Sequence, residues 1–216
     1  MPAKPSRRPP ATASRRPRRT YHHGDLPRAL RAAAKTLVAR RGADGFTLRE
    51  AARVVGVNHA AVYRHFADKR TLLAALAEEG YATLAARMRT AQARVPERDV
   101  LERLRRASLA YVRFALDEPA VFGLMTGPRL NEDRRFPGLE RALQGAVEVL
   151  QAPLREGQAR GVLRPGPLVD QTLAILSLIH GYAQFVLTRR FHVRPARLGA
   201  YLATLLDPLL AGLRAG

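Results

Sequence analysis

Hydrophobic residues recur at intervals of three and four along most of the chain from residue 25 onward. The first such stripe consists of Leu26, Leu30, Ala33, Leu37 and Val38. This spacing places the apolar side chains on one face of an α-helix. Helical patterns also occur near residues 99–117, 119–126, 137–160, 167–190 and 195–213. Since no alternating β pattern of useful length is present, the sequence predicts an all-α fold of about nine helices.

Capping residues set the expected ends of the first helices. Asp25 is a plausible N-cap with Pro27 in the first turn, and this helix should run to about Arg41, where Gly42 follows. The Thr47-Leu48-Arg49-Glu50 stretch reads as a capping box, which opens a short second helix that ends near Val54.

A tight turn follows this short helix. Gly56 supplies the turn, Asn58 caps a third helix through about His65, and Asp68 caps a fourth helix that begins at Lys69. Two short helices joined by a glycine-containing turn match the helix-turn-helix plan, in which the first helix crosses the DNA backbone and the second lies in the major groove. Such a motif can also serve as a protein-interaction element.

The outward face of the third helix carries side chains suited to DNA. Arg64 can donate to guanine O6 and N7, and His59 can donate to a base edge or a phosphate. Small residues at Ala60 and Ala61 let the backbone approach the groove and meet thymine methyl groups. The donors suited to phosphates are those of Thr47, Tyr63, His65 and Lys69. The alternative is that Tyr63, His65 and Phe66 pack the short helix against its neighbours, which we accept for Phe66.

Charge supports a polyanionic partner. The chain carries a net charge of +19, and residues 1–70 hold 17 basic and four acidic residues. Clustering of this kind suits nucleic acid, although arginine richness also occurs in generically basic proteins. Residues 1–20 are rich in proline and basic residues and nearly devoid of apolar ones, which predicts a disordered basic arm. The arm would track phosphates, enter a minor groove, or add only non-specific affinity.

The stretch from Gly24 to about Tyr81 closely resembles the DNA-binding domain of the TetR/AcrR family. The matching residues are Thr47, Ala52, Gly56, Val57, Tyr63, His65, Phe66, Lys69 and Leu72. The resemblance implies backbone contacts by Thr47, Tyr63, His65 and Lys69. It places Arg49, His59, Ala60, Ala61 and Arg64 where base contacts occur, and Asn58 completes the expected DNA-binding set. The motif Ile179-His180-Gly181 is similar to the Trp-His-Gly signature of one subgroup, with Ile179 in place of the tryptophan.

The C-terminal part has features of a dimerisation surface. Residues 173–187 have no polar face, and residues 198–213 carry a dense leucine stripe, so these helices need cover on more than one side. Two such helices suit a four-helix bundle across a two-fold axis, or they pack only within one chain. The expected interface residues are Leu178, Gly181, Tyr182, Phe185, Tyr201, Leu202, Leu205 and Leu209.

The resemblance also implies a ligand cavity inside the C-terminal part. Residues able to line it are Tyr111, Phe114, Phe122, Met125, His180 and Gln184, each of which can instead be ordinary core. His180 is either a core histidine with a satisfied hydrogen bond or a ligand anchor, with Gln184 as its partner or as a second polar contact. No acidic residue lies nearby in sequence, so a strongly cationic effector is not suggested.

Motifs of other function classes are missing from the sequence. There is no cysteine, no metal-ligand histidine spacing, no P-loop, no dinucleotide fingerprint and no Gly-x-Ser-x-Gly, so we expect no enzyme, no metal and no cofactor. Neither a signal peptide nor a membrane span is evident, which predicts a cytoplasmic protein.

These patterns predict three segments: an arm (1–20), a DNA-binding domain (21–70), and a ligand-sensing and dimerisation domain (71–216). The predicted function is a homodimeric repressor of a palindromic operator. An unknown small-molecule effector would release it by shifting the spacing of the two DNA-binding domains. The alternatives are an activator with the same DNA-binding domain and a ligand-independent DNA-coating protein.

Overall fold

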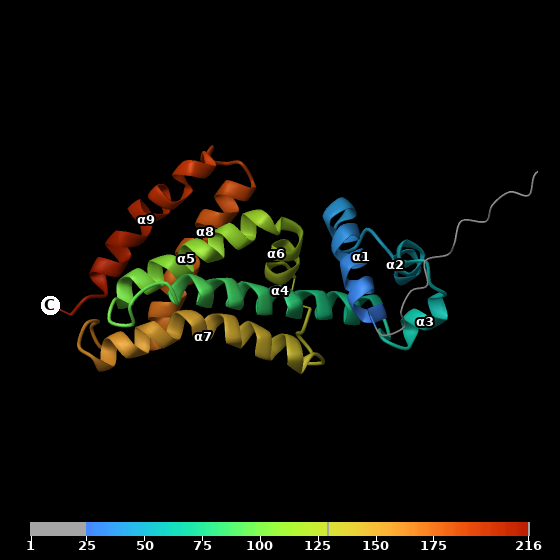
Figure 1. Cartoon of the computed structure of the whole chain (residues 1–216), viewed down its shortest axis with the longest axis horizontal. Coiled ribbons are helices and arrows are strands. Elements are labelled where there is room, and N and C mark those ends of the chain that lie inside the picture. Colours follow the sequence, from blue (N-terminus) through green and yellow to red (C-terminus); the bar gives the residue numbers. More distant parts are fainter. Residues whose placement is uncertain (1–24, 129, 216) are drawn as a thin grey trace, which may run out of the picture.

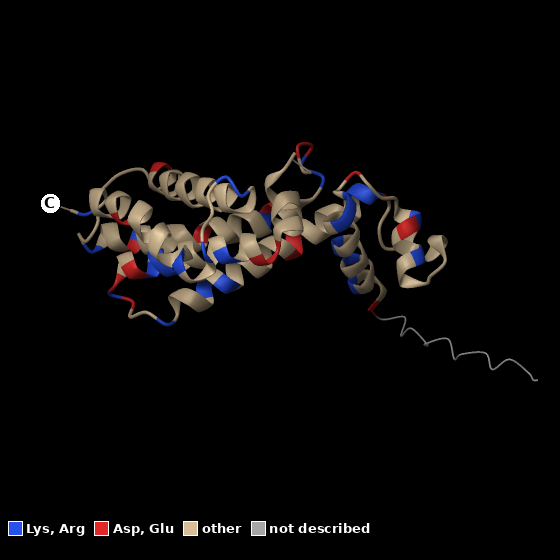
Figure 2. Ribbon diagram, turned by 90° about the horizontal axis from the view of Figure 1, so that it is seen from above, with Lys and Arg blue, Asp and Glu red and all other residues tan. Residues whose placement is uncertain are grey.

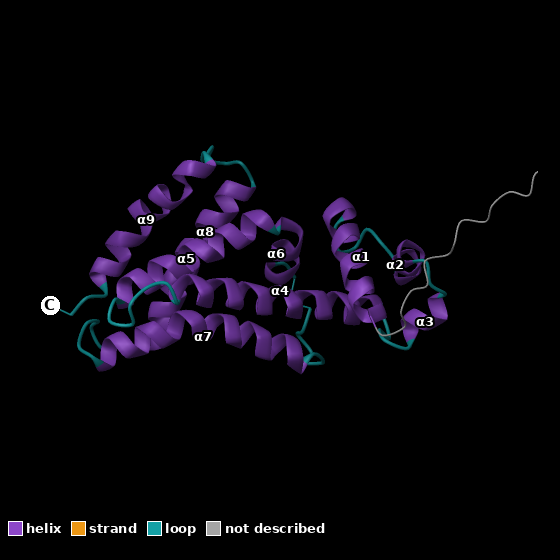
Figure 3. Ribbon diagram, in the orientation of Figure 1, coloured by secondary structure: helices purple, strands orange, loops and turns teal. Residues whose placement is uncertain are grey.

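The computed structural model describes residues 25–128 and 130–215, and the basic arm predicted for residues 1–20 lies outside them. Figures 1 and 3 show helices joined by short loops, which confirms the all-α class. No strand occurs in the described ranges, where only an isolated bridge joins Leu163 to Arg214. The α-helices are α1 (Leu26–Arg41), α2 (Leu48–Val55), α3 (His59–Tyr63), α4 (Lys69–Gln92), α5 (Val100–Asp117), α6 (Pro119–Thr126), α7 (Pro137–Ala159), α8 (Leu168–Leu187) and α9 (Leu198–Gly212).

Helices α1–α3 and their turns, residues 25–68, form a small unit that we call the head (Figure 1). Leu30 and Ala34 of α1 are fully buried against Ala51 of α2 and Val62 of α3. Asp25 stands at the N-cap of α1 but makes no capping hydrogen bond, because its carboxylate pairs with Arg28 instead. The head is therefore held by its apolar core and by the caps of α2 and α3.

Helices α4–α9, residues 69–215, form the larger unit that we call the body. The 24-residue helix α4 starts beside the head and runs into the body, where it packs on α5 and α7 (Figure 1). Leu72 and Met88, near its two ends, are both buried, so one helix contributes to both ends of the core. The predicted boundary at residue 70 falls within the first turn of α4.

Helix α6 lies close against the middle of α4 because of a glycine. A Cβ atom at Gly80 would lie 2.6 Å from Sδ of Met125 and 2.7 Å from Cγ1 of Val121, so a side chain there would push α6 away. Next to this contact, the Tyr81 hydroxyl donates to the carbonyl of Met125 at 2.8 Å. The missing side chain at Gly80 and the hydrogen bond of Tyr81 thus hold α6 against α4.

Two helices end earlier than their patterns predict. The third helix stops at Tyr63, since the amides of His65 and Phe66 both turn back to the carbonyl of Val62. Helix α8 ends at Leu187 rather than near residue 190, because Arg189 adopts a left-handed conformation with φ 54°. The amide of Arg190 then donates to the carbonyl of Phe185, as in a Schellman-type ending.

No helix in the described part of the chain is long and apolar enough to cross a membrane.

Candidate functional site

The two short helices of the head are fixed at both ends. Thr47 and Glu50 form the predicted capping box: the Thr47 hydroxyl accepts from the amide of Glu50 at 3.3 Å, and Glu50 accepts from the amide of Thr47 at 2.8 Å. Gly56 ends α2 with φ 80°, a conformation that suits glycine. The Asn58 side chain then caps α3 by accepting from the amide of Ala60 at 3.0 Å. Local hydrogen bonds therefore set the angle at which α3 leaves α2.

Hydrogen bonds also hold the Glu50 carboxylate in its charged form. Arg41 donates to it, and the amide and hydroxyl of Thr47 add two more bonds, so the pKa of Glu50 lies below its ordinary value. The charged carboxylate suits the N-terminus of α2, where the helix dipole favours negative charge. The capping box thus persists at neutral pH.

The outward side of α3 lies at the end of the molecule farthest from α9 (Figure 1). Tyr63 is 48% exposed although it is a large aromatic residue, while Val62 next to it is buried and anchors the helix. Ala61 is half-buried. The other predicted DNA-binding residues of α2, α3 and their flanks are all exposed: Thr47, Arg49, Asn58, His59, Ala60, Arg64 and His65.

Lys69, the tenth residue of that set, is bound within the protein. Its ammonium donates to the carbonyls of Asp44 and Phe46 at 3.3 and 3.2 Å and lies 5.5 Å from the centre of the Phe46 ring. An ammonium group has three donors, so one stays available for a phosphate. Lys69 therefore ties the loop between α1 and α2 to the start of α4, a role that the sequence did not suggest.

The basic residues of segment 1–70 are divided mainly between the head and the residues that precede it. Figure 2 shows Lys and Arg along α1 and also over the body, interspersed with acidic residues. Residues 25–68 contain eight basic and four acidic residues, whereas seven further basic residues belong to the segment before residue 25. Much of the positive charge of residues 1–70 thus belongs to that segment.

The body contains a cavity of about 300 Å³ lined by residues of α4, α5, α6, α7 and α8. Four of the six residues predicted to line a cavity do so: Tyr111, Phe122, Met125 and His180. The remaining lining comes mainly from residues that the sequence analysis did not single out. They are Tyr81, Leu84, Met88, Thr126, Leu143, Ala146, Val147, Leu173, Leu176 and Ser177.

Phe114 and Gln184 do not line this cavity, and in this respect the prediction is wrong. Phe114 is buried on another face of α5, where its ring lies 5.4 Å from the guanidinium carbon of Arg87. Gln184 lies one turn beyond His180, and its backbone carbonyl accepts from the hydroxyl of Thr188 at 2.7 Å.

His180 forms its hydrogen bond with Tyr111 of α5, another residue that lines the cavity, rather than with Gln184. Its Nδ1 lies 3.0 Å from the hydroxyl of Tyr111, and its ring lies 5.5 Å from that of Phe122. Burial raises the pKa of Tyr111, so its hydroxyl stays protonated and can donate to Nδ1. With Nδ1 accepting, the proton of a neutral His180 resides on Nε2, which becomes a hydrogen-bond donor.

Helices α8 and α9 present an apolar surface that residues 25–128 and 130–215 leave uncovered. Large residues are exposed there, among them Leu173 (59%), Phe185 (50%), Tyr201 (50%) and Leu205 (48%). Between the two helices lies a hollow of about 620 Å³, to which Leu178 and Gly181 also contribute. Among the described residues, no atom outside the backbone of α8 and the residues next to Gly181 lies within 4 Å of a Cβ built on Gly181.

Three residues of the predicted dimer interface lie deeper than the apolar surface. Leu202 is only 2% exposed, and Leu209 is partly buried against the core. Tyr182 is 7% exposed, and its hydroxyl donates to the carbonyl of Leu198 at 3.1 Å. Tyr182 and Leu202 therefore join α8 to α9 within the chain, and Tyr182 also lines the hollow.

Comparison with known families matches both units. Residues 30–76 match the model described as "Bacterial regulatory proteins, tetR family", and residues 104–209 match "Tetracyclin repressor-like, C-terminal domain". The chain belongs to the TetR family of transcriptional regulators. Its head is thus the DNA-binding helix-turn-helix domain of a TetR regulator, and TetR family proteins typically act as dimers.

Individual relatives span nearly the whole chain. The nucleoid occlusion factor SlmA of Serratia proteamaculans is 30% identical over 175 residues, which are 78% of this chain and 85% of that protein. A protein of unknown function from Rhodococcus sp. RHA1 superposes with a TM-score of 0.78 at 29% identity, over 91% of this chain and 100% of the other. The fold is also that of FadR from Bacillus subtilis, solved in complex with stearoyl-CoA, with a TM-score of 0.69 at 17% identity over 87% and 99% of the two chains.

Proposed function

We propose that this TetR protein is a cytoplasmic transcriptional repressor, not an enzyme, which binds a palindromic operator as a homodimer. A small-molecule effector in the body cavity releases it from DNA. The observation that carries the proposal is the combination of an exposed helix-turn-helix face at one end with an uncovered apolar surface on α8 and α9. A two-fold axis through that surface would present two heads to successive major grooves.

In this proposal the residues of the head divide into two roles. Arg64 and His59 read base edges, assisted by Arg49, while Ala60 and Ala61 allow α3 to approach the groove. Thr47, Tyr63, His65 and the remaining donor of Lys69 bind phosphates and fix the register of the head on the duplex. Asn58 acts through its cap, because its side-chain oxygen already accepts from Ala60.

The cavity favours an uncharged, largely apolar effector with one hydrogen-bond acceptor. No charged side chain lines it, and burying an unpaired ligand charge there would be costly. The Nε2 donor of His180 is the polar group expected to meet a carbonyl or ether oxygen. FadR, which shares the fold, was solved with stearoyl-CoA, so a body of this architecture can accommodate a ligand.

A second candidate function is ligand-independent binding along DNA. The curated relatives at about 30% identity are named nucleoid occlusion factors, which favours this alternative. The cavity favours the effector-controlled regulator, since a protein that only coats DNA has no use for it. An activator with the same head would have the same geometry and is separated from a repressor by transcription assays on the regulated promoter.

Selection of bound DNA from a random library, followed by footprinting, tests the proposed operator binding. We expect one palindromic motif whose half-sites are about 34–36 Å apart or a multiple of this. On a long duplex the footprint should stay confined to that motif at protein concentrations that saturate it. Uniform protection along the duplex, with no enriched motif, would instead support a DNA-coating protein.

Two matched uncharged probes test the cavity. We expect 2-acetonaphthone, which has a carbonyl, and naphthalene, which lacks one, both to bind the protein in calorimetric titrations. His180→Phe should weaken 2-acetonaphthone about three- to tenfold, the effect of one lost hydrogen bond, and leave naphthalene nearly unchanged. Equal effects on both probes would contradict the donor role of His180. If neither probe bound, the proposal of an apolar effector would be contradicted.

A further inference from the structure

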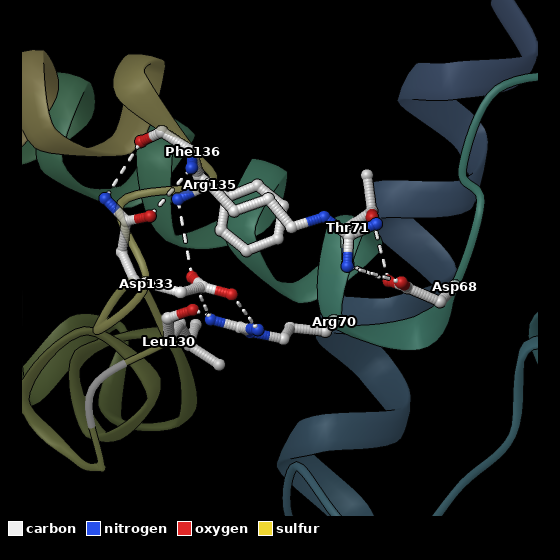
Figure 4. A network of polar contacts seen from close by, with 8 residues as sticks. Asp68, Arg70, Thr71, Leu130, Asp133, Arg135 and Phe136 are labelled. Atoms are coloured by element: carbon white, nitrogen blue, oxygen red, sulfur yellow. Dashed lines mark hydrogen bonds and ion pairs between the residues drawn. The ribbon is translucent and has the colours of Figure 1, made fainter.

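The start of α4 is tied to the loop between α6 and α7 by a set of ion pairs (Figure 4). Both Nη groups of Arg70 donate hydrogen bonds to the carboxylate of Asp133, at 2.7 and 2.6 Å. Its Nε donates to the carbonyl of Leu130 at 2.8 Å. In a second ion pair the loop supplies the cation: Arg135 lies 2.9 Å from the carboxylate of Asp68. We call these four charged residues, Asp68, Arg70, Asp133 and Arg135, the junction clamp. Each side of the junction thus supplies one cation and one anion.

The loop is built to hold its two clamp residues in place. The Asn131 amide is buried and closes the loop by bonding both the amide and the carbonyl of Phe136, at 2.7 and 3.1 Å. Arg134 adopts φ 56°, a conformation that is uncommon for a residue other than glycine. The Phe136 ring lies 5.3 and 5.4 Å from the guanidinium carbons of Arg70 and Arg135. A fixed loop therefore presents these charges to α4.

The clamp connects directly to the DNA-binding helices. One oxygen of Asp68 caps α4 by accepting from the amide and hydroxyl of Thr71, and its other oxygen receives Arg135. Asp68 lies five residues after the end of α3, and Lys69 binds the loop that leads into α2. Residues 68–70 therefore contact three segments: the loop between α6 and α7, the first turn of α4, and the loop that leads into α2.

The head also rests on the body through α1. The backbone crosses from head to body once, at the start of α4, and α1 rests on α4 and α6. Two further ion pairs, Arg31 with Glu79 and Lys35 with Glu118, join α1 to α4 and to the residue before α6, each through a single contact. Bidentate Arg–carboxylate pairing restricts orientation more strongly than a single contact.

We propose that the junction clamp fixes the angle of the head on the body and thereby sets the half-site spacing that the dimer accepts. The four residues are positioning residues for operator recognition, since they act on α3 through the start of α4. The inference rests on the proposed dimeric DNA binding. It predicts that breaking the clamp relaxes the discrimination between spacings without changing the base preferences within each half-site.

The test measures affinity for the selected operator and for versions with one or two base pairs inserted or removed at its centre. Asp133→Asn should lower the ratio of affinities between the best and the altered spacings by roughly threefold or more. The charge-swapped double variant Arg70→Asp/Asp133→Arg should recover part of that ratio. Glu148→Gln is the matched control, because Glu148 and Arg155 form a bidentate exposed pair within α7 that does not touch the head.

The outcomes separate the clamp from simpler effects. Equal weakening of Asp133→Asn at every spacing, or an effect of the same size in Glu148→Gln, would overturn the inference. Should Asp133→Asn not fold, Arg135→Gln, which removes the pair with Asp68 and the contact with the Phe136 ring, replaces it with the same expected result. Failure of the wild-type chain to select any palindrome would instead refute the proposed function, before spacing is measured.

Discussion

Phe185→Glu is expected to convert the protein to a monomer and to weaken operator binding about 100-fold or more. Phe185 is 50% exposed on the apolar surface of α8 and α9, and its ring packs edge-on against Phe191 at 5.3 Å. A carboxylate there would be buried without a partner when two copies associate, which carries a large free-energy cost. Each monomer would then bind a single half-site and lose the benefit of joint binding by two linked heads.

Sedimentation equilibrium and gel-shift titrations check this result, with Val162→Glu as the control. Val162 is an exposed apolar residue in the turn between α7 and α8, away from the hollow between α8 and α9. This control should stay dimeric and bind the operator like the wild-type chain. A Phe185→Glu variant that remained dimeric, or a monomer that kept full operator affinity, would contradict the proposed interface.

Arg64→Ala is expected to relax the preference at one base pair of each half-site by about 5- to 150-fold, or about 1–3 kcal/mol. Arg64 is exposed at the C-terminal end of α3, where its guanidinium can reach guanine O6 and N7. Since α3 is anchored by Val62 and capped by Asn58, removing Arg64 should leave the helix in place. Affinity measurements on all single-base variants of the operator would locate the affected position.

Lys69→Ala should behave differently in the same measurements. We expect it to weaken all operator variants alike and to lower the slope of log affinity against log salt, because a phosphate contact carries no sequence information. Loss of its bonds to Asp44 and Phe46 should also lower the thermal stability of the head. If Arg64→Ala and Lys69→Ala had the same profile across sites and salt concentrations, the division of roles would be wrong.

The head was predictable because its determinants are local in sequence. The capping box of Thr47 and Glu50, the cap of α2 at Gly56 and the cap at Asn58 each involve residues no more than four positions apart. Helix ends are also local, yet α8 was predicted too long, because a left-handed arginine at residue 189 took the place that glycine usually fills. Sequence patterns identify the common way to end a helix and miss the rarer one.

The cavity was predictable only in part, since five helices build it. An apolar helical stripe shows which residues are buried but not whether they meet a neighbour or an empty space. Phe114 and Phe122 look equivalent in the sequence, yet only Phe122 lines the cavity. The Tyr111–His180 contact joins residues 69 positions apart, and no local signal pairs them.

The amino-acid sequence was sufficient for the all-α class, the helix-turn-helix and its exposed α3 face, because helical periodicity and capping act over a few residues. Packing decided which apolar residues remain uncovered: Phe185 and Tyr201 lie on the outside of α8 and α9, whereas Tyr182 and Leu202 join these helices. Packing also brought Asp133 to Arg70, 63 positions away, and bound Lys69 of α4 to a backbone carbonyl of the head. Such contacts depend on how the helices cross, and residue spacing along one helix does not specify that geometry.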